Sequence, residues 1–347
     1  MKKLLGFFIV MFLFANLVSN ANEIEIQPTM QSKSNTQDRV WVGSFQLAWN
    51  DFIDRVVHNP IRFREGTPLS VYELNKKEFS SDDISSESYY KLVSKVNKKT
   101  KKEIEKTLKK KFDVKSDIIN SLDLTPSNDK YIIYAILKKD FEFVNEFDKL
   151  GKSMFGIDDM AEYFGIDQNS KRELGRGIRV LFYNSPDDFA LQIPTKNNED
   201  VYLYRNSANK AFCQIYADML KKQTLYRGNI EFTINDELKV PFINFFKEQS
   251  FDEIASKRVM GTNLVINQAL EAISFNMDNK GGRLKSEASL GFTTTSLVPD
   301  EEKRRFYYEN TFVIFLKEKG KTSPYFALRV NDIKKYQKLK WLSFLIL

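Results

Sequence analysis

A single cysteine and a single histidine set the strongest limit on what this chain can fold into. Cys213 and His58 are the only residues of their kinds among 347. A disulfide within the chain is therefore impossible, and so is a zinc site built from several Cys and His ligands. The fold must rest on a hydrophobic core, for which 42% hydrophobic residues are sufficient. Any chemistry must use carboxylates, hydroxyls, Arg, Lys or the backbone, unless His58 itself takes part.

Residues 1–21 have the pattern of a cleaved secretory signal. Two lysines precede an apolar run over residues 4–14, and Ser-Asn-Ala at residues 19–21 has the small-x-small pattern of a cleavage site. A transmembrane helix needs about 20 apolar residues, so an uncleaved membrane anchor is the less favoured interpretation. We expect a secreted protein, with retention in a periplasm as the alternative, and no stable insertion in a membrane.

The remaining sequence predicts two domains after a flexible leader. Residues 22–39 are polar and contain few large apolar side chains, so we expect a mobile leader there. Residues 40–200 are predicted to form a mainly helical domain of unknown role, because residues 131–150 carry aromatic and aliphatic side chains at helical spacing. Residues 201–347 are predicted to form a second domain. Glycine and proline total 23 residues, which favours well-formed elements over long loops.

The segment 91–115 is unusually rich in lysine. It holds eleven lysines and three acidic residues, a net charge of +8. Val96, Ile104, Leu108 and Phe112 fall on one face of a helix. Such a segment can attract anionic lipid or nucleic acid, but no aromatic residues interleave the lysines and the flanking segments are not basic. We therefore interpret it as the solvated face of a helix and expect no nucleic-acid binding.

The last third of the chain combines strand and helix patterns. Residues 225–234 are predicted to form a half-buried strand, since Ile230, Phe232 and Ile234 alternate with other residues. Residues 290–297 are predicted to form a threonine-rich strand, and residues 262–279 a helix between the two strands. The other expected elements are a helix at 208–222, with Phe212, Ile215 and Leu220 inward and Cys213 as a small core residue, and strands at 178–183, 311–316 and 325–330. This order predicts an α+β domain with a mainly antiparallel sheet.

Two of these segments together resemble a known family. Tyr226-Arg227-Gly228, followed by Gly-Phe-Thr-Thr-Thr-Ser at residues 291–296, is similar in order to the signature of mono-ADP-ribosyltransferases. The resemblance is to the arginine–serine–glutamate group, which includes the enzymatic components of clostridial binary toxins and vertebrate ecto-transferases, and it covers roughly residues 200–347. It implies that this part forms an antiparallel β-sandwich with flanking helices, so that with the mostly helical N-terminal half predicted above the whole chain is expected to be α+β. It also implies a secreted bacterial toxin or effector that transfers ADP-ribose from NAD to a protein side chain.

The resemblance implies roles for five residues. Arg227 would hold phosphate or ribose oxygens of NAD with its planar guanidinium, and Gly228 would permit a close approach. Thr294 stands at the family's first serine position and would hold the glutamate or the ribose, while Thr295 and Ser296 would fix the strand and the nicotinamide pocket. The implied catalytic residues are Arg227, Thr294 and Ser296. The implied NAD-binding residues are these three with Gly228 and Thr295, and the reaction needs no metal.

Residues after the threonine-rich strand complete the implied site. In the family an aromatic side chain packs on nicotinamide, and Phe306, Tyr307 and Tyr308 are the candidates for this role. Arg304 or Arg305 would reach a phosphate. The implied small-molecule partner is NAD, consumed as a substrate, and the implied acceptor is a protein of a host cell.

The C-terminal end departs from the family's pattern. A Glu-x-Glu or Gln-x-Glu should precede a final strand, but residues 334–341 contain no glutamate. The interval from Arg227 to Thr294 spans 67 residues, longer than the family generally shows. Either Asp332 substitutes for the glutamate, or the chain is an impaired copy truncated at its C-terminus, since loss of a catalytic group usually costs orders of magnitude in rate.

Two other functions stay open at this point. The first is a non-catalytic secreted protein-binding module, in which the aromatic-rich residues 40–200 dock on a partner. The second is a carboxylate-based hydrolase that uses Asp300 and Glu301. Those two acidic residues also suit the N-terminus of a helix after Pro299.

Overall fold

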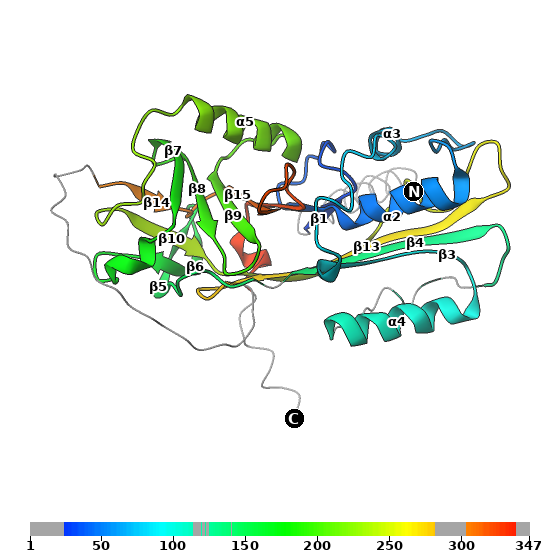
Figure 1. The fold of residues 1–347 in the computed structure, drawn as a ribbon, viewed down its shortest axis with the longest axis horizontal. Coiled ribbons are helices and arrows are strands. Elements are labelled where there is room, and N and C mark those ends of the chain that lie inside the picture. Colours follow the sequence, from blue (N-terminus) through cyan, green and yellow to red (C-terminus); the bar gives the residue numbers. More distant parts are fainter. Residues whose placement is uncertain are drawn as a thin grey trace, which may run out of the picture.

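Three β-sheets form the framework of the chain (Figure 1). The computed structural model describes residues 24–113, 119, 122, 125–139, 141–281 and 303–337. A seven-stranded sheet has the order β1-β2-β16-β15-β9-β8-β7. Its strands are β1 (Glu25–Gln27), β2 (Arg39–Val42), β7 (Arg179–Ser185), β8 (Asp188–Pro194), β9 (Glu199–Arg205), β15 (Phe312–Glu318) and β16 (Phe326–Val330). All of its pairs are antiparallel except β1 with β2.

The other two sheets lie beside it. A four-stranded sheet has the order β14-β10-β6-β5, with β5 (Asp148–Phe155), β6 (Asp159–Ile166), β10 (Glu237–Pro241) and β14 (Arg305–Tyr307). A five-stranded sheet has the order β11-β13-β4-β3, with β12 (Lys257–Arg258) paired to β13. Its longer strands are β3 (Tyr89–Lys95), β4 (Lys130–Lys139), β11 (Ile243–Ser250) and β13 (Val265–Met277). We call this five-stranded assembly the central sheet.

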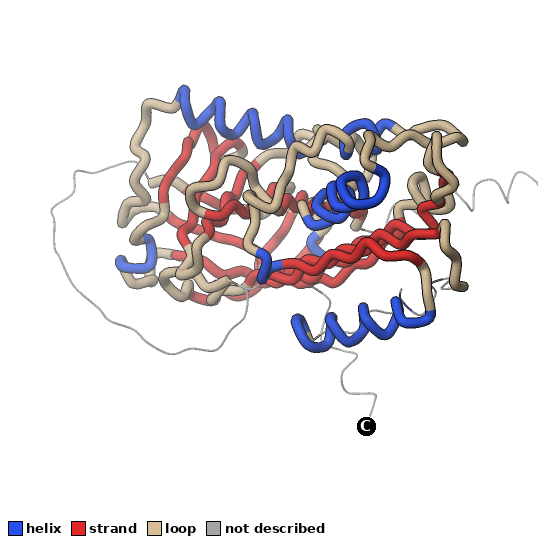
Figure 2. The backbone as a smooth tube through the Cα atoms, turned by 45° about the vertical axis from the view of Figure 1, so that its right-hand side comes forward, coloured by secondary structure: helices blue, strands red, loops and turns tan. Residues whose placement is uncertain are grey.

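Helices cover both faces of the central sheet. Figure 2 shows α2 (Ser44–Phe52) on one side of the long strands and α4 (Lys98–Phe112) on the other. A π-helix, Ile53–Val57, continues α2, and the short α3 (Leu69–Leu74) lies near it. On the seven-stranded sheet, α5 (Phe212–Leu225) packs Phe212 and Tyr216 against the ring of Phe315. Three 3-10 turns, Ser86–Ser88, Arg172–Gly175 and Ile333–Lys335, complete the elements.

The central sheet shares one hydrophobic core with the seven-stranded sheet. The ring of Phe275 on β13 stacks on Phe326 of β16, with centroids 4.5 Å apart, and also contacts Phe141 and Phe245. All four of these side chains are buried. A sheet face must be covered by another layer to stay out of water, and these rings provide that cover between the two sheets.

Several predicted elements are confirmed. Within the lysine-rich segment 91–115, Lys98–Phe112 forms α4 with Ile104, Leu108 and Phe112 buried, as expected, whereas residues 91–95 belong to β3 and Val96 precedes the helix. The predicted helix at 208–222 corresponds to α5, although Leu220 is 39% exposed rather than inward. The predicted strands at 178–183, 311–316 and 325–330 correspond to β7, β15 and β16.

The predicted helical N-terminal half and C-terminal β-sandwich are wrong. Residues 131–150 and 262–279, both expected to be helical, contain β4 and β13 instead. Because both faces of the central sheet are covered, residues 132–137 of β4 and 269–273 of β13 are buried on both sides and lack the alternation that marks a half-exposed strand. A continuous apolar run contains i, i+3 and i+4 pairs by default, so its spacing mimics a helix.

Two further expectations, the strand at 225–234 and the mobile leader at 22–39, are also wrong. Residues 225–234 form no strand beyond an isolated bridge at Glu231, and Ile230 and Ile234 are about half exposed. The expected mobile leader contributes β1, in which Ile26 and Gln27 are buried beside β2. The predicted strand at 290–297 and the predicted signal at 1–21 lie outside the described residues.

The shared core leads to a stability prediction. Phe275→Ala should lower the free energy of unfolding by about 3–5 kcal/mol, because it removes a buried ring from between two sheets. Phe246→Ala on the neighbouring strand is the matched control: its ring is 46% exposed, and the loss should stay below about 1 kcal/mol. Urea unfolding of both variants measures the difference. Equal losses in the two variants would contradict this assignment of the core.

Candidate functional site

A parallel strand pair at the middle of the central sheet is its most unusual feature. β4 and β13 run parallel, from Lys130 opposite Val265 to Lys139 opposite Phe275, with one irregularity at residues 266–268. The outer pairs, β3 with β4 and β11 with β13, are antiparallel. We call the β4–β13 boundary the parallel seam. It is the one place in this sheet, within the described residues, where two neighbours do not alternate in direction.

The two faces of the seam pack against different layers. Ile133, Ala135 and Leu137 of β4 belong to the main core on the α2 side, together with Ala269 and Ile273 of β13. On the other face, α4 covers a smaller cluster that includes Ile132, Tyr134, Ile136, Leu270 and Ala272. The seam is therefore buried on both faces, with α2 packed on one and α4 on the other.

A buried carboxylate connects the seam to the N-terminus of α2. Glu271 of β13 is 1% exposed, and its Oε1 accepts hydrogen bonds from Ser44 Oγ at 2.8 Å and from the Phe45 backbone N–H at 3.0 Å. Across the seam, Glu271 lies opposite Ala135. The first N–H groups of a helix have no partner within the helix, so a carboxylate there satisfies one of them and interacts well with the helix dipole.

Burial dominates the chemistry of Glu271. It raises the pKa of this carboxyl well above its ordinary value of 4.5, against the opposite effect of the two hydrogen bonds. Oε2 is buried without a hydrogen-bond partner among the described residues. Burying a carboxyl group with an unpaired oxygen costs free energy, so we interpret Glu271 as a residue whose hydrogen bonds hold α2 against the seam.

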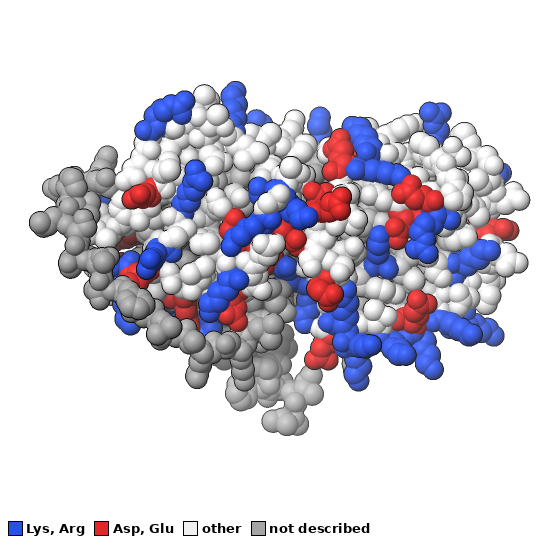
Figure 3. Space-filling view, viewed as in Figure 1, with Lys and Arg blue, Asp and Glu red and all other residues white. Residues whose placement is uncertain are grey.

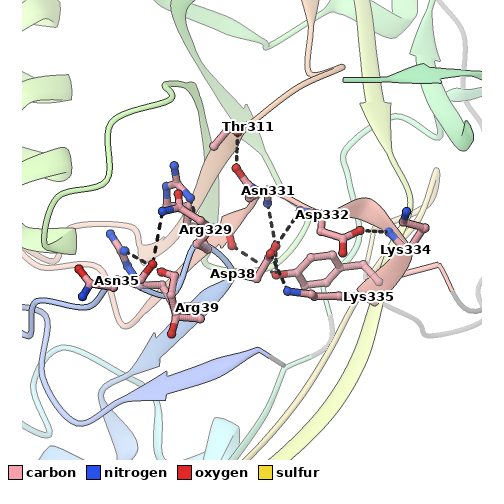
Figure 4. Close-up of polar contacts among 12 residues, drawn as sticks. Asn35, Asp38, Arg39, Thr311, Arg329, Asn331, Asp332, Lys334 and Lys335 are labelled. Atoms are coloured by element: carbon pink, nitrogen blue, oxygen red, sulfur yellow. Dashed lines mark hydrogen bonds and ion pairs between the residues drawn. The ribbon is translucent and has the colours of Figure 1, made fainter. Parts of the chain in front are cut away.

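A second buried polar cluster lies at the end of β16 (Figure 4). Asp38 accepts hydrogen bonds from the backbone N–H groups of Asn331 and Asp332 and from the Tyr336 hydroxyl, and an ion pair from Lys335 at 3.0 Å. Its carboxylate is thereby fully used to fix the turn that follows β16. Asp332 itself accepts a hydrogen bond from the Lys334 backbone N–H at the start of the last 3-10 turn.

Two buried arginines beside this cluster hold a loop. Arg39 on β2 and Arg329 on β16 lie opposite each other in the sheet. Burial and the neighbouring Arg39 lower the pKa of Arg329 to about 10. Arg329 donates to the carbonyls of Gln37 and Ser207, and Arg39 to the carbonyl of Lys210. These bonds fix the chain between β9 and α5.

The residues of the expected NAD site are not assembled into one site within the described residues. Arg227 is exposed in the turn after α5 and donates to the carbonyls of Thr224 and Tyr226 in its own turn. Gly228 next to it is also exposed. The other expected site residues, Thr294, Thr295 and Ser296, lie outside the described residues, as do Asp300 and Glu301.

The expected aromatic and phosphate-binding residues have other contacts. Phe306 is fully buried between Phe189 and Phe232, and Tyr308 is buried with its hydroxyl on the Leu203 carbonyl. The Tyr307 hydroxyl donates to Glu237, which also contacts Lys303 and Arg305. Arg304 makes a bidentate ion pair with Asp236 and donates hydrogen bonds to the carbonyls of Asn229 and Glu231.

The described residues offer few other reactive groups. They contain no group of three or more His, Cys, Asp or Glu side chains that could hold a metal ion. Burial raises the pKa of the Cys213 thiol in α5, which disfavours the reactive thiolate form. His58 is exposed and ends the π-helix after α2 with a left-handed backbone. Within the same part of the chain, no helix is long and apolar enough to cross a membrane.

Sequence reasoning missed Glu271. The signal was available: one carboxylate stands within an otherwise apolar and small-residue run, Leu270 to Ile273. It was placed on a predicted helix, where a charged residue every few positions is ordinary. On a strand buried on both faces, the same carboxylate cannot reach solvent and requires a hydrogen-bond partner within the protein.

The comparisons with known proteins find likeness in the fold and none in the sequence. No protein-family model and no curated protein matches the amino-acid sequence. Among solved structures, the thermophilic serpin Tengpin in its native state matches with a TM-score of 0.53 and 12% identity, over 88% of this chain and 91% of that one. Serpin48 from the insect Tenebrio molitor matches with a TM-score of 0.48 and 13% identity, over 85% and 92%. The chain has a serpin-like fold.

The serpin-like fold overturns the transferase hypothesis. The resemblance to mono-ADP-ribosyltransferases is wrong, and with it the expected toxin activity, because the fold is like that of the serpin Tengpin. Short motifs carried that resemblance, and their order along the chain does not depend on the fold around them. The expectation that NAD is a substrate came only from this resemblance and lapses with it.

The buried Glu271 predicts a pH dependence of stability. Its raised pKa means that the native state keeps the proton at pH values where the unfolded chain has lost it, so stability falls as the pH rises above about 4.5. Glu271→Gln keeps an acceptor for Ser44 and Phe45 and removes this loss. Its advantage over wild type should grow by up to about 1.4 kcal/mol per pH unit until the native carboxyl ionises. Chemical denaturation between pH 4 and 8 measures it.

The control is Glu87→Gln, which removes an exposed carboxylate in the 3-10 turn just before β3. Its stability difference from wild type should not follow the profile of the Glu271 variant. A difference between Glu271→Gln and wild type that stays constant across this pH range would contradict the account.

Proposed function

We propose that this protein binds proteases and inhibits them through a rearrangement of the central sheet. The observation that carries the proposal is the parallel seam at the middle of an otherwise antiparallel sheet. The serpin-like fold supports it, because serpins act by inserting a loop as an extra strand into a sheet of their own. The partner under this proposal is a protease, so the protein acts by binding another protein.

The strand directions support the proposal, because an added strand at the seam would stabilise the central sheet. A strand placed between β4 and β13, and running opposite to both, would make every neighbouring pair of the long strands antiparallel. Antiparallel pairs are slightly more stable per residue than parallel ones, and one parallel ladder would be replaced by two antiparallel ladders. The sheet is therefore built so that an added strand lowers its free energy, provided that α2 and α4 permit the seam to open.

The order of strands along the chain supplies a source for such a strand. β13 ends at Met277 in the central sheet, and the next described strand, β14, begins at Arg305 in the four-stranded sheet. A segment that turns back directly after β13 necessarily runs opposite to β13, and hence also to β4. Cleavage of the chain between β13 and β14 would remove the tether to β14 and release that segment.

The proposal also includes a cellular location. We infer that the protein acts outside the cytoplasm, because residues 1–21 have the pattern of a secretory signal. The lone cysteine is compatible with such a location, since it leaves no disulfide to be formed.

A second candidate function is protein binding without inhibition. Arg283, Lys285 and Glu287 alternate in the sequence directly after β13. On an inserted strand, all three charges would point to one face of a seam that α2 and α4 now cover on both sides. Burying unpaired charges costs several kcal/mol, and this observation favours a protein that binds a partner but does not complete the insertion.

Exposure to proteases should separate these two functions. The full-length mature protein is incubated with a panel of serine proteases, and residual protease activity is followed together with the melting temperature of the cleaved protein. The inhibitor proposal requires that protease activity is lost and that the melting temperature of the cleaved protein rises by roughly 10 °C or more. Since each kcal/mol of added stability shifts the melting temperature of a chain of this size by about 2–4 °C, such a rise corresponds to several kcal/mol. Cleavage without either change would overturn the inhibitor proposal, and complex formation without cleavage would support the binding function.

A reversible lock across the seam tests the mechanism itself. Lys138 and Ser274 lie opposite each other in the parallel pair, on the α4 side, so cysteines at both positions can be bridged. With Cys213→Ser to remove the native thiol, the oxidised Lys138→Cys/Ser274→Cys protein should show neither inhibition nor a gain in melting temperature after cleavage. The same protein after reduction is its own control and should regain both. Equal behaviour in the two redox states would contradict opening of the seam.

A further inference from the structure

A cavity of about 360 Å³ lies between β1, α3 and the turn that follows β11. Its lining comes from three segments that are far apart in the sequence, within residues 25–33, 69–73 and 249–253. None of these segments belongs to the parallel seam. On the face drawn in Figure 3, basic side chains gather over α4, and acidic side chains lie among basic ones in the region of β1 and α3. A cavity of this volume suits a small molecule.

The lining of the cavity is acidic. Four carboxylates contribute to it, those of Glu25, Glu73, Asp252 and Glu253. Lys33 also lines the cavity, so that the lining has a net charge of −3. None of the four carboxylates has an ion pair within the described residues. A cationic group in the cavity would supply the missing counter-charge.

Two hydrogen bonds join the walls of the cavity. The hydroxyl of Thr29, after β1, donates to Glu73 of α3 at 2.6 Å, and the hydroxyl of Ser70 in α3 donates to Glu253 after β11. Each bond uses one carboxylate oxygen and leaves the other without a hydrogen bond from the part of the chain that the structure describes. The walls are therefore fixed in the absence of a ligand, which lowers the cost of ordering them on binding.

A buried amide in the lining lacks a partner. Gln27 of β1 lines the cavity and is 1% exposed, and its Nε2 donates to no acceptor among the described residues. Gln249 of β11, by contrast, bonds to both the N–H and the carbonyl of Ile26 at 2.9 Å. Glu25 and Gln27 are alternate residues of β1, so their side chains lie on the same side of the strand. A buried donor without an acceptor costs free energy, and an acceptor oxygen on a bound molecule would remove that cost.

Apolar side chains complete the lining. Phe251 is buried, whereas Leu69 at the start of α3 is 70% exposed. The methylene groups of a long basic side chain pack on such apolar surface while its charged end reaches carboxylates.

We propose that this cavity binds a free basic amino acid. Its cationic side chain would lie toward the carboxylates, its methylene groups against Leu69 and Phe251, and its own carboxylate toward Gln27 and Lys33. The inference does not depend on the proposed protease inhibition, because the cavity lies outside the seam.

Two other cations fit the cavity less well. A metal ion needs several ligands that converge on one point, and the described residues contain no group of three or more His, Cys, Asp or Glu side chains that could hold one. A simple polyamine would match the carboxylates but carries no acceptor oxygen for Nε2 of Gln27. Both features of the lining are matched by a ligand that has a cation at one end and a carboxylate at the other.

Isothermal titration calorimetry of the full-length mature protein tests the proposal with three probes of similar size. L-Arginine carries both charged ends, agmatine lacks the carboxylate, and L-citrulline has a neutral urea group in place of the guanidinium. At about 0.1 M salt, L-arginine should bind with a dissociation constant of about 1 mM or below. Agmatine and L-citrulline should each bind about 10-fold more weakly.

Two variants assign the binding to this cavity. Asp252→Asn/Glu253→Gln should weaken the binding of L-arginine about 10-fold. The matched control Asp82→Asn/Glu87→Gln removes two exposed carboxylates outside the cavity and should bind as wild type does. Gln27→Met removes the unpartnered amide at similar volume. It should weaken the binding of L-arginine and leave that of agmatine unchanged, a difference that a merely structural role of Gln27 would not produce.

The melting temperature of each variant verifies that it is folded. Absence of L-arginine binding by wild type at about 10 mM would overturn the proposal, and so would equal affinities of the two double variants. Agmatine binding as tight as that of L-arginine would overturn it in favour of a simple polyamine site. An equal loss of L-arginine and agmatine binding in Gln27→Met would contradict the pairing of Gln27 with the ligand's carboxylate.

Discussion

Two-sided burial of the parallel seam is the constraint on which the rest of the structure depends. α2 and α4 cover opposite faces of β4 and β13, and the buried stretches 132–137 and 269–273 are accordingly hydrophobic except for Glu271. This burial also makes a charge on the seam costly, which explains why Glu271 needs the N-terminus of α2 as its partner. The same arrangement leaves a less stable parallel ladder at the centre of an antiparallel sheet.

A helix with one solvated face and two short apolar strands could be predicted from the sequence, and the long strands β4 and β13 could not. α4 shows its apolar stripe plainly because lysines fill the opposite side, and β15 and β16 show compact apolar runs between polar segments. β4 and β13 carry no such contrast, so their apolar spacing was mistaken for a helix. What distinguishes them is the layer on each side, and both covering helices, α2 and α4, come from earlier parts of the chain.

The candidate site shows the same limit. A lone carboxylate in an apolar run was visible, but its meaning depends on Ser44 and Phe45, more than two hundred residues earlier. Conversely, Tyr226-Arg227-Gly228 looked like a catalytic motif and is a surface turn whose arginine bonds to nearby carbonyls. The scarcity of His and Cys excludes sites built from several such residues, and the strand rearrangement proposed above requires none of them.

Hydrogen exchange in β4 tests the central claim most directly. In the intact protein, the backbone N–H groups of Lys130–Lys139 are bonded within the pairs that β4 makes with β3 and β13. After cleavage between β13 and β14, a strand added at the seam would pair with β4 in place of β13, and exchange across β4 and β13 should slow by the added stability of the sheet. Exchange that is unchanged or faster in both strands after cleavage would contradict the account.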